Sequence, residues 1–137
     1  MTVNEYLLQY RILVLETNRL KAEYEREKSE IDEIKSPLGG DGMPHGNGIS
    51  NTVEDRALRL YDKAMSYETA RLDALEKRQE IFDTVMRLKG IEADVIYEYY
   101  LNLKTWDEVA ETVHVDPRSV YRIRLRAFKK LSLYVSR

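Results

Sequence analysis

Apolar residues recur at alternating steps of four and three along two long stretches of this sequence, and this spacing limits its possible folds more than any other feature. Side chains at these steps share one face of an α-helix and have the spacing of a coiled coil. The sequence therefore predicts two long helices. In the first stretch the steps connect nine positions, seven of them apolar or aromatic: Tyr6, Tyr10, Leu13, Thr17, Leu20, Tyr24, Glu27, Ile31 and Ile34.

The second stretch repeats this pattern and adds another stripe beside it. The first stripe comprises Val53, Ala57, Leu60, Ala64, Tyr67, Arg71, Ala74, Arg78, Ile81, Val85 and Leu88, and the second comprises Leu58, Tyr61, Met65, Leu72, Leu75, Phe82 and Met86. Joined by one loop, the two helices most simply form an antiparallel hairpin. Such a hairpin would leave the second stripe in water. We expect a homo-oligomer to cover it; the alternative is a monomer whose C-terminal helices fold back over it.

Local signals mark the ends of both helices. Thr2 followed by Glu5 fits a capping box at the start of the first helix, and Ser36-Pro37 ends it, because proline disfavours helix in the residue before it. The second helix is predicted to begin at 51–52, where an Asn-Thr pair can cap it, and to stop at Gly90.

Between the helices, residues 36–51 include "GGDGMPHGNG", which holds five of the six glycines in the chain. This segment lacks the G-K-[ST] ending of a phosphate-binding loop and follows no strand, so it is not predicted to bind a nucleotide. Asp41, His45 and Asn47 are three mixed groups in one loop, which is too little to predict a metal site. We expect a connector that becomes ordered against RNA polymerase or a sister subunit.

The formal net charge of −2 conceals a strong asymmetry. Residues 117–137 contain seven basic and no acidic side chains; the other 15 basic and all 24 acidic residues precede them, which gives that longer part a net charge of −9. This distribution predicts a polyanionic partner at the C-terminus.

Other compositional features exclude several classes of protein. The chain has no cysteine, no long apolar run and no basic start, so we expect a cytoplasmic protein without disulfides, a signal peptide or a membrane span. We find no catalytic set of residues, and expect neither enzymatic activity nor a cofactor.

From Ile91 onward the periodicity shortens and predicts three helices, of which the last two form a helix-turn-helix. Thr105 and Glu108 fit a capping box, and small Ala110 stands where the two helices cross closely. His114-Val115 forms the turn, and Asp116-Pro117 caps and starts the last helix, which is predicted over 117–134. Its inward face is predicted to comprise Val120, Ile123, Ala127 and Leu131.

The outward face of the last helix is predicted to bind double-stranded DNA. In a helix-turn-helix the first turns of this helix enter the major groove, and arginine can bind guanine O6 and N7 together. The predicted base contacts are Arg118, Ser119, Tyr121 and Arg122. The predicted contacts to the DNA backbone are Thr105, Arg124, Arg126, Lys129 and Lys130.

The segment "YYLNLKTWDEVAETVHVDPRSVYRIRLRAFKKL" resembles the C-terminal, promoter-reading helix-turn-helix of bacterial sigma factors. The likeness rests on "EVAE", on the short turn and on the closing "RAFKKL". His114 departs from the pattern, because glycine usually occupies this turn position, and Arg124 stands where an apolar residue is common. Ile123 is expected to take over that core position.

Nearly the whole chain resembles the RinA/ArpU-type transcriptional regulators of Gram-positive phages and prophages. The most specific part is "DGMPHGNGISNTVED", in its place between the two long helices. This resemblance implies a regulator, an activator of late phage genes, with a helical hairpin over 1–89 for oligomerisation and partner contact and a sigma-like helix-turn-helix domain over 91–137. Two alternatives remain open: a DNA-packaging subunit similar to a small terminase, and a coiled-coil adaptor that does not bind DNA.

Overall fold

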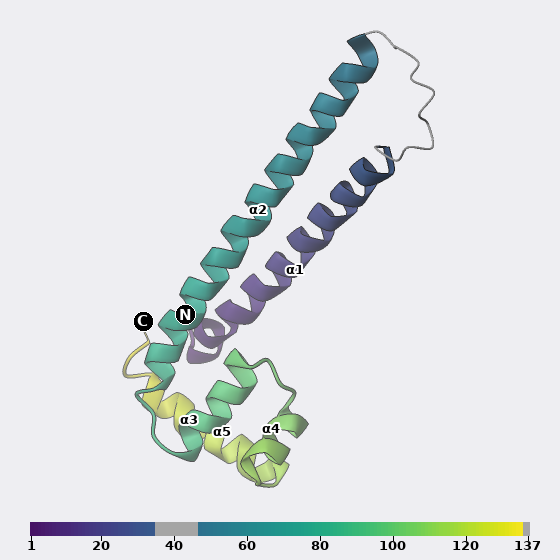
Figure 1. Cartoon of the computed structure of the whole chain (residues 1–137). Helices are drawn as coiled ribbons and strands as arrows, with labels where there is room; N and C mark the ends of the chain where they lie inside the picture. The colour runs from purple at the N-terminus through teal and green to yellow at the C-terminus, as the bar shows by residue number, and fades with distance from the viewer. Residues whose placement is uncertain (35–46, 136–137) are drawn as a thin grey trace. The chain divides into compact units, whose positions relative to one another are not determined.

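The computed structural model describes the backbone of residues 1–34 and 47–135, and the side chains of residues 1–32 and 53–135. This part of the chain is helical and contains no β-strand, so the predicted all-α fold class is confirmed. Most of segment 36–51 lies outside the described residues. The elements in chain order are α1 (Val3–Ile34), α2 (Asn47–Val85), α3 (Ile91–Ile96), the π-helix η2 (Tyr97–Leu101), α4 (Trp106–Val113) and α5 (Pro117–Leu131) (Figure 1).

The start of α1 is confirmed in detail, because the backbone N–H of Glu5 donates to Thr2 Oγ1 at 3.1 Å and the N–H of Thr2 donates to Glu5 Oε2 at 3.4 Å. The predicted ends of α2 are wrong. It begins at Asn47 rather than at 51–52, since no proline after Pro44 prevents the helix from extending by another turn. It ends at Val85 rather than near Gly90.

A tight turn explains the early end of α2. The N–H of Met86 continues the helical pattern by donating to Phe82 O at 2.9 Å, but the N–H of Leu88 donates only three residues back, to Val85 O at 2.9 Å. This tightening brings Leu88 into the core, where 5% of it is exposed. Gly90 has a φ of 65°, which is favourable for glycine, and it precedes α3.

The chain divides into two compact units, one made of Met1–Val14 with Asp73–Arg137 and the other of Leu15–Leu72. The boundary that we predicted between residues 89 and 91 therefore falls inside the first unit. In the second unit α1 and α2 run antiparallel, as Arg59 Nε donates to Glu27 Oε1 at 3.2 Å and Tyr24 stacks on Tyr67 at 6.3 Å. None of the described side chains of this second unit is buried.

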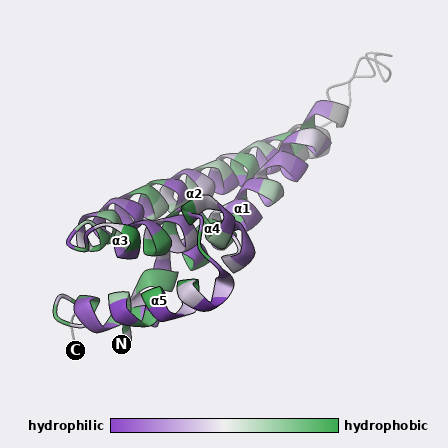
Figure 2. Cartoon of the chain, turned by 90° about the horizontal axis from the view of Figure 1, so that it is seen from below, coloured by the Kyte–Doolittle hydropathy of each residue, from purple (hydrophilic) through white to green (hydrophobic). Residues whose placement is uncertain are grey.

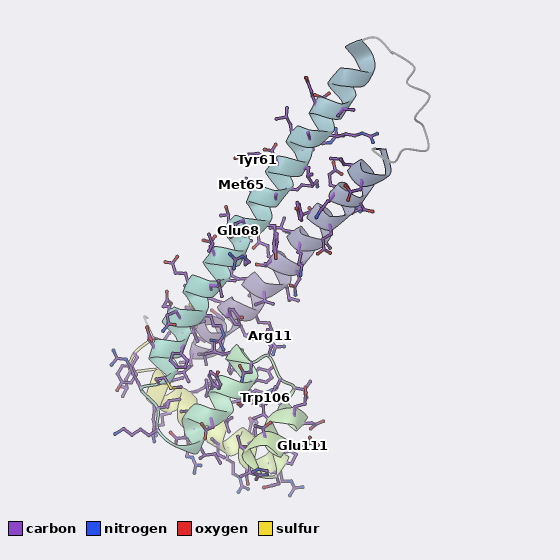
Figure 3. The ribbon with its side chains drawn as sticks, in the orientation of Figure 1. Arg11, Tyr61, Met65, Glu68, Trp106 and Glu111 are labelled. Atoms are coloured by element: carbon purple, nitrogen blue, oxygen red, sulfur yellow. The ribbon has the colours of Figure 1, made fainter. Side chains whose placement is uncertain are left out.

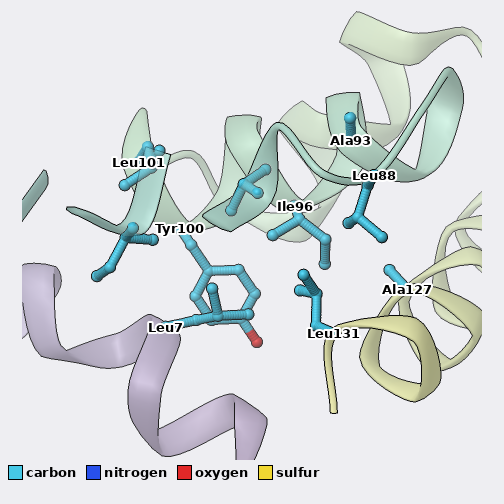
Figure 4. Close-up of a cluster of buried hydrophobic side chains, with 10 residues drawn as sticks. Leu7, Leu88, Ala93, Ile96, Tyr100, Leu101, Ala127 and Leu131 are labelled. Atoms are coloured by element: carbon cyan, nitrogen blue, oxygen red, sulfur yellow. The ribbon is translucent and has the colours of Figure 1, made fainter. Parts of the chain in front are cut away.

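The first unit contains the buried core. One cluster joins α1, α2, α3, η2 and α5 (Figure 4); its buried members are Leu7, Ile81, Val85, Leu88, Ala93, Ile96, Tyr100, Leu101, Ala127 and Leu131. Tyr100 is fully buried and its hydroxyl donates to Asn4 Oδ1 at 2.6 Å, so the core includes a satisfied polar group. Burial raises the pKa of the Tyr100 hydroxyl.

The sequence did not predict the π-helix η2. The N–H of Asn102 donates five residues back, to Tyr97 O at 3.0 Å, and Leu103 then adopts a positive φ of 58°. Residue 103 ends the helical segment and leads the chain toward α4. Val95 and Ile96 are fully buried, whereas Tyr99 and Leu103 are only half-buried.

Candidate nucleic-acid interface

The turn between α4 and α5 has the predicted local geometry. Glu108 N–H donates to Thr105 Oγ1 at 3.2 Å and Thr105 N–H donates to Glu108 Oε1 at 3.0 Å, which completes the capping box. The bond from the Thr105 N–H lowers the pKa of the Glu108 carboxyl. His114 has φ 59° and ψ 43°, so it occupies the left-handed position at which glycine is usual.

Asp116 precedes α5 and Pro117 is its first residue, as predicted, but α5 ends at Leu131 rather than at 134, because the chain tightens into a turn there: the N–H of Leu133 donates three residues back, to Lys130 O at 3.2 Å. The Asp116 side chain does not cap the backbone; instead it accepts a hydrogen bond from the Ser119 hydroxyl at 2.6 Å, and this bond lowers the pKa of the Asp116 carboxyl. A second buried cluster then holds α3, α4 and α5 together through Val95, Val109, Ala110, Val120 and Ile123.

The buried residues of α5 determine which side chains face outward. Val120, Ile123, Ala127 and Leu131 are all buried, which confirms the predicted inward face. At 100° per residue the opposite side of the helix carries the basic stripe, which we define as Arg118, Arg122, Leu125 and Lys129. All four are exposed, and α5 alternates between hydrophilic and hydrophobic residues in Figure 2.

The three cations of the basic stripe are not held by carboxylates of the protein. Arg118, Arg122 and Lys129 form no ion pair with any residue that the structure describes. Lys129 lies eleven residues after Arg118, so the stripe extends about 17 Å at 1.5 Å per residue. It therefore offers three exposed positive charges along one side of a rigid helix.

Two other predicted contacts lie on the flank of α5 and pair with Glu92 of α3. Lys130 Nζ lies 2.9 Å from Glu92 Oε2, and Arg126 Nε lies 3.8 Å from Oε1. Glu92 Oε2 has no aligned hydrogen-bond donor, so the Lys130 contact is an ion pair without hydrogen-bond geometry. The Glu92 side chain is only 12% exposed, while those of Arg126 and Lys130 remain 63% and 62% exposed.

Arg124 is placed differently from the other basic residues of α5. Its guanidinium lies 4.9 Å from the centre of the Trp106 ring and 5.0 Å from that of Phe128, and its Nε is buried without a hydrogen-bond partner. Arg124 is half-buried, and Ile123 takes the core position instead, as expected. Arg124 therefore supports the packing of the helix-turn-helix, unlike the phosphate contact that we predicted for it.

Trp106 and Arg124 belong to a stack that extends to α1. Tyr99 lies parallel to Trp106, with ring centres 3.6 Å apart. The guanidinium of Arg11, a residue of α1, lies over the Tyr99 ring, 4.8 Å from its centre. Arg11 Nη2 also donates to the Tyr99 carbonyl at 3.3 Å, and Figure 3 labels Arg11 and Trp106. Two cations thus enclose two aromatic rings and fix α4 and α5 to the first turns of α1.

The remaining predicted contacts have mixed surroundings. Tyr121 is 57% exposed, on the side of α5 next to Arg124. Ser119 is half-buried and its hydroxyl donates to Asp116. Thr105 is exposed, but Asp107 and Glu108 share its helical turn, so a phosphate there would meet two carboxylates.

Sequence reasoning missed two residues of this surface. Leu125 is 49% exposed in the middle of the basic stripe, and its step of three from Arg122 could have placed it there. No local signal identifies Glu92, which lies 34 residues before Arg126 in the chain. Its role depends on the packing of α3 against α5.

Other kinds of site find little support among the described residues. Within residues 1–32 and 53–135 no three His, Asp or Glu side chains gather to hold a metal ion, and Asp41, His45 and the Asn47 side chain lie outside these ranges. None of the helices described here combines the length and the apolar character needed to cross a membrane. Comparisons with protein-family models, curated proteins and solved structures give no match to this chain.

Proposed function

We propose that this chain is a sequence-specific DNA-binding transcriptional regulator of the RinA/ArpU type, an activator of late phage genes. The observation that carries the proposal is the basic stripe of α5, whose Arg118, Arg122 and Lys129 are exposed and unpaired within the described residues. These cations follow a left-handed turn and a buried helix-turn-helix core. The resemblance to sigma factors supports the same function.

The dimensions of the stripe suit the major groove of DNA. A B-DNA major groove is about 12 Å wide and 8.5 Å deep, and it admits one α-helix. Arg118 and Arg122 lie in the first turns of α5, which would place their guanidinium groups at base edges. Lys129, about 17 Å from Arg118 along the helix, would reach a phosphate. Leu125 between them suits a thymine methyl group.

The decisive experiment has two stages. Fragments of the source genome and of its prophages are first selected on the full-length protein and sequenced, and we expect a few discrete sites to be retained. Binding to one such site is then measured by fluorescence anisotropy for wild type and for the Arg118→Ala/Arg122→Ala variant. We expect the variant to lose preference for this site over an unrelated duplex by at least tenfold.

A charge-matched control separates groove contacts from general attraction to DNA. Arg19→Ala/Arg26→Ala removes two exposed arginines from α1, and we expect it to keep the preference for the selected site. If both double variants lose binding equally, net charge alone attracts the DNA and the basic stripe is not the reading surface. Failure to retain any fragment contradicts the proposal as a whole.

One observation favours the second candidate, a coiled-coil adaptor without DNA binding. The exposed face of α4 carries Asp107, Glu108 and Glu111, which would repel phosphates and would suit a basic protein partner. Loss of all duplex binding, combined with a stable oligomer, would favour this candidate. The third candidate, a packaging subunit, is distinguished by native mass, since a ring of eight or more subunits favours packaging and a dimer or tetramer favours the regulator.

A further inference from the structure

From Leu58 to the turn residue Met86 just after its end, one face of α2 is largely apolar and mostly exposed. Its positions follow steps of three and four without a break, and we name them the outer stripe: Leu58, Tyr61, Met65, Glu68, Leu72, Leu75, Gln79, Phe82 and Met86. Figure 3 labels three of them. Phe82 is half-buried against Tyr97, but the six other apolar members are between 44% and 63% exposed.

The order of residues in the outer stripe is symmetric from Tyr61 to Met86, and Leu58 lies outside this symmetric part. If each position is matched with the one equally far from the midpoint between Asp73 and Ala74, leucine faces leucine and each polar residue faces the other polar residue. Methionine then faces an aromatic residue twice. The matched pairs are Leu72 with Leu75, Glu68 with Gln79, Met65 with Phe82, and Tyr61 with Met86.

We propose that α2 packs against α2 of a second copy of this chain, as an antiparallel coiled coil centred between Asp73 and Ala74. An antiparallel pair of helices places each position of one helix against its mirror position on the other. Each match also joins the two kinds of core position, the a and d positions of the heptad, as antiparallel packing requires. The proposal does not depend on DNA binding.

The polar pair fixes this orientation. Glu68 would lie against the partner's Gln79, whose amide N–H can donate to the carboxylate. Gln79 Nε2 already donates to Asp83 Oδ1 at 2.8 Å, which leaves its second hydrogen available. In a parallel pair Glu68 would face the partner's Glu68, so two carboxylates would meet with no amide N–H between them to donate.

Arg71 and Arg78 lie beside the outer stripe and could pair with carboxylates of a parallel partner, but both contact groups of their own chain. Arg71 Nε donates to Glu68 at 3.1 Å within the same helix. The Arg78 guanidinium lies 5.9 Å from the Tyr10 ring and 5.8 Å from the Tyr97 ring, on the α1 side of α2. Both arginines therefore already have partners within their own chain.

A second copy also supplies what the unit Leu15–Leu72 lacks. None of the described side chains there is buried, although Leu58, Tyr61 and Met65 are apolar and largely exposed. The matched region from Tyr61 to Met86 extends about 38 Å at 1.5 Å per residue. A contact of this length would cover the outer stripe from Tyr61 to Met86 on both copies.

Cysteine cross-linking tests the orientation directly, because the natural chain has no cysteine. Tyr61→Cys and Met86→Cys chains are oxidised separately and as an equimolar mixture. We expect a disulfide dimer only in the mixture, since Cα atoms must lie within about 7 Å to form a disulfide and two copies of position 61 would be about 38 Å apart. A disulfide dimer from either variant alone indicates a parallel pair and overturns the proposal.

Sedimentation of the full chain supplies the second measurement, with folding checked by circular dichroism. We expect a dimer, and expect Glu68→Leu to weaken it at least tenfold because the partner's Gln79 loses its acceptor. Asp73→Leu removes one negative charge from an exposed position outside the stripe and should leave the dimer unchanged. Glu68→Leu/Gln79→Leu should restore the dimer and yield disulfides in both orientations. A wild-type monomer at high micromolar concentration overturns the proposal.

Discussion

The ion pairs of Glu92 with Arg126 and Lys130 predict that removal of the Glu92 charge strengthens DNA binding. Glu92→Gln keeps the size of the side chain and removes the charge that faces Lys130 at 2.9 Å and Arg126 at 3.8 Å. Because both cations are more than 60% exposed, we expect the free energy of unfolding to change by less than about 1 kcal/mol. The variant should nevertheless bind DNA more tightly than the wild type.

The size of this effect follows from counterion release. Each phosphate that a cation neutralises contributes about 0.9 to the slope of log K against log salt. If Glu92 withholds both Arg126 and Lys130 from the duplex, Glu92→Gln steepens the slope by up to about 1.8. At 0.1 M salt that slope corresponds to a gain of up to about 60-fold over the wild type, if the affinities coincide at 1 M.

Fluorescence anisotropy of one duplex at several salt concentrations measures the slope. Glu111→Gln is the matched control, because it removes the same charge from an exposed position of α4. The triple variant Glu92→Gln/Arg126→Ala/Lys130→Ala should lose the gain. An unchanged slope in Glu92→Gln, or an equal gain in Glu111→Gln, would show that Glu92 does not withhold Arg126 and Lys130 from the duplex.

Three further predictions concern single residues. Arg122→Ala should reduce discrimination at one base pair by about 1–3 kcal/mol, and an unchanged preference among duplexes would remove it from the base-contacting set. His114→Gly should stabilise the fold by about 0.5–1 kcal/mol in chemical denaturation, because the strain that glycine relieves at φ 59° is larger than the entropic cost of ordering a glycine. His114→Ala should not stabilise the fold. The hydrogen bond from Lys104 lowers the pKa of Glu98 below 4.5, so this pair stabilises the fold above pH 4.5 and its contribution is lost as pH falls through the lower folded-state pKa. Glu98→Gln should flatten this acid limb of the stability curve, and an identical limb would contradict the pairing.

Local chemistry explains which features were predictable from the sequence. A capping box such as Thr105 with Glu108 joins residues three apart, and the inward face of α5 repeats every three or four residues. The left-handed turn at His114 is also local, since a helix-turn-helix needs this conformation whatever residue occupies it. These features need no knowledge of distant parts of the chain.

The features that the sequence did not predict correctly depend on distant contacts or on small changes in helix register. Arg124 was expected at a phosphate because it is basic and lies on α5, but its position only 40° from the buried Val120 turns it toward Trp106. The π-helix η2 shifts the register by one residue, which a periodicity of 3.6 does not anticipate.

The sequence by itself determined the helices, the helix-turn-helix core and the surplus of positive charge at its C-terminal end, because periodicity and capping act within a few residues. Only the tertiary structure decided which of those charges are available. Glu92 reaches α5 across 34 residues of chain and Arg11 completes a stack with Tyr99 across 88, and both contacts arise only when the folded core brings α1, α3 and α5 together.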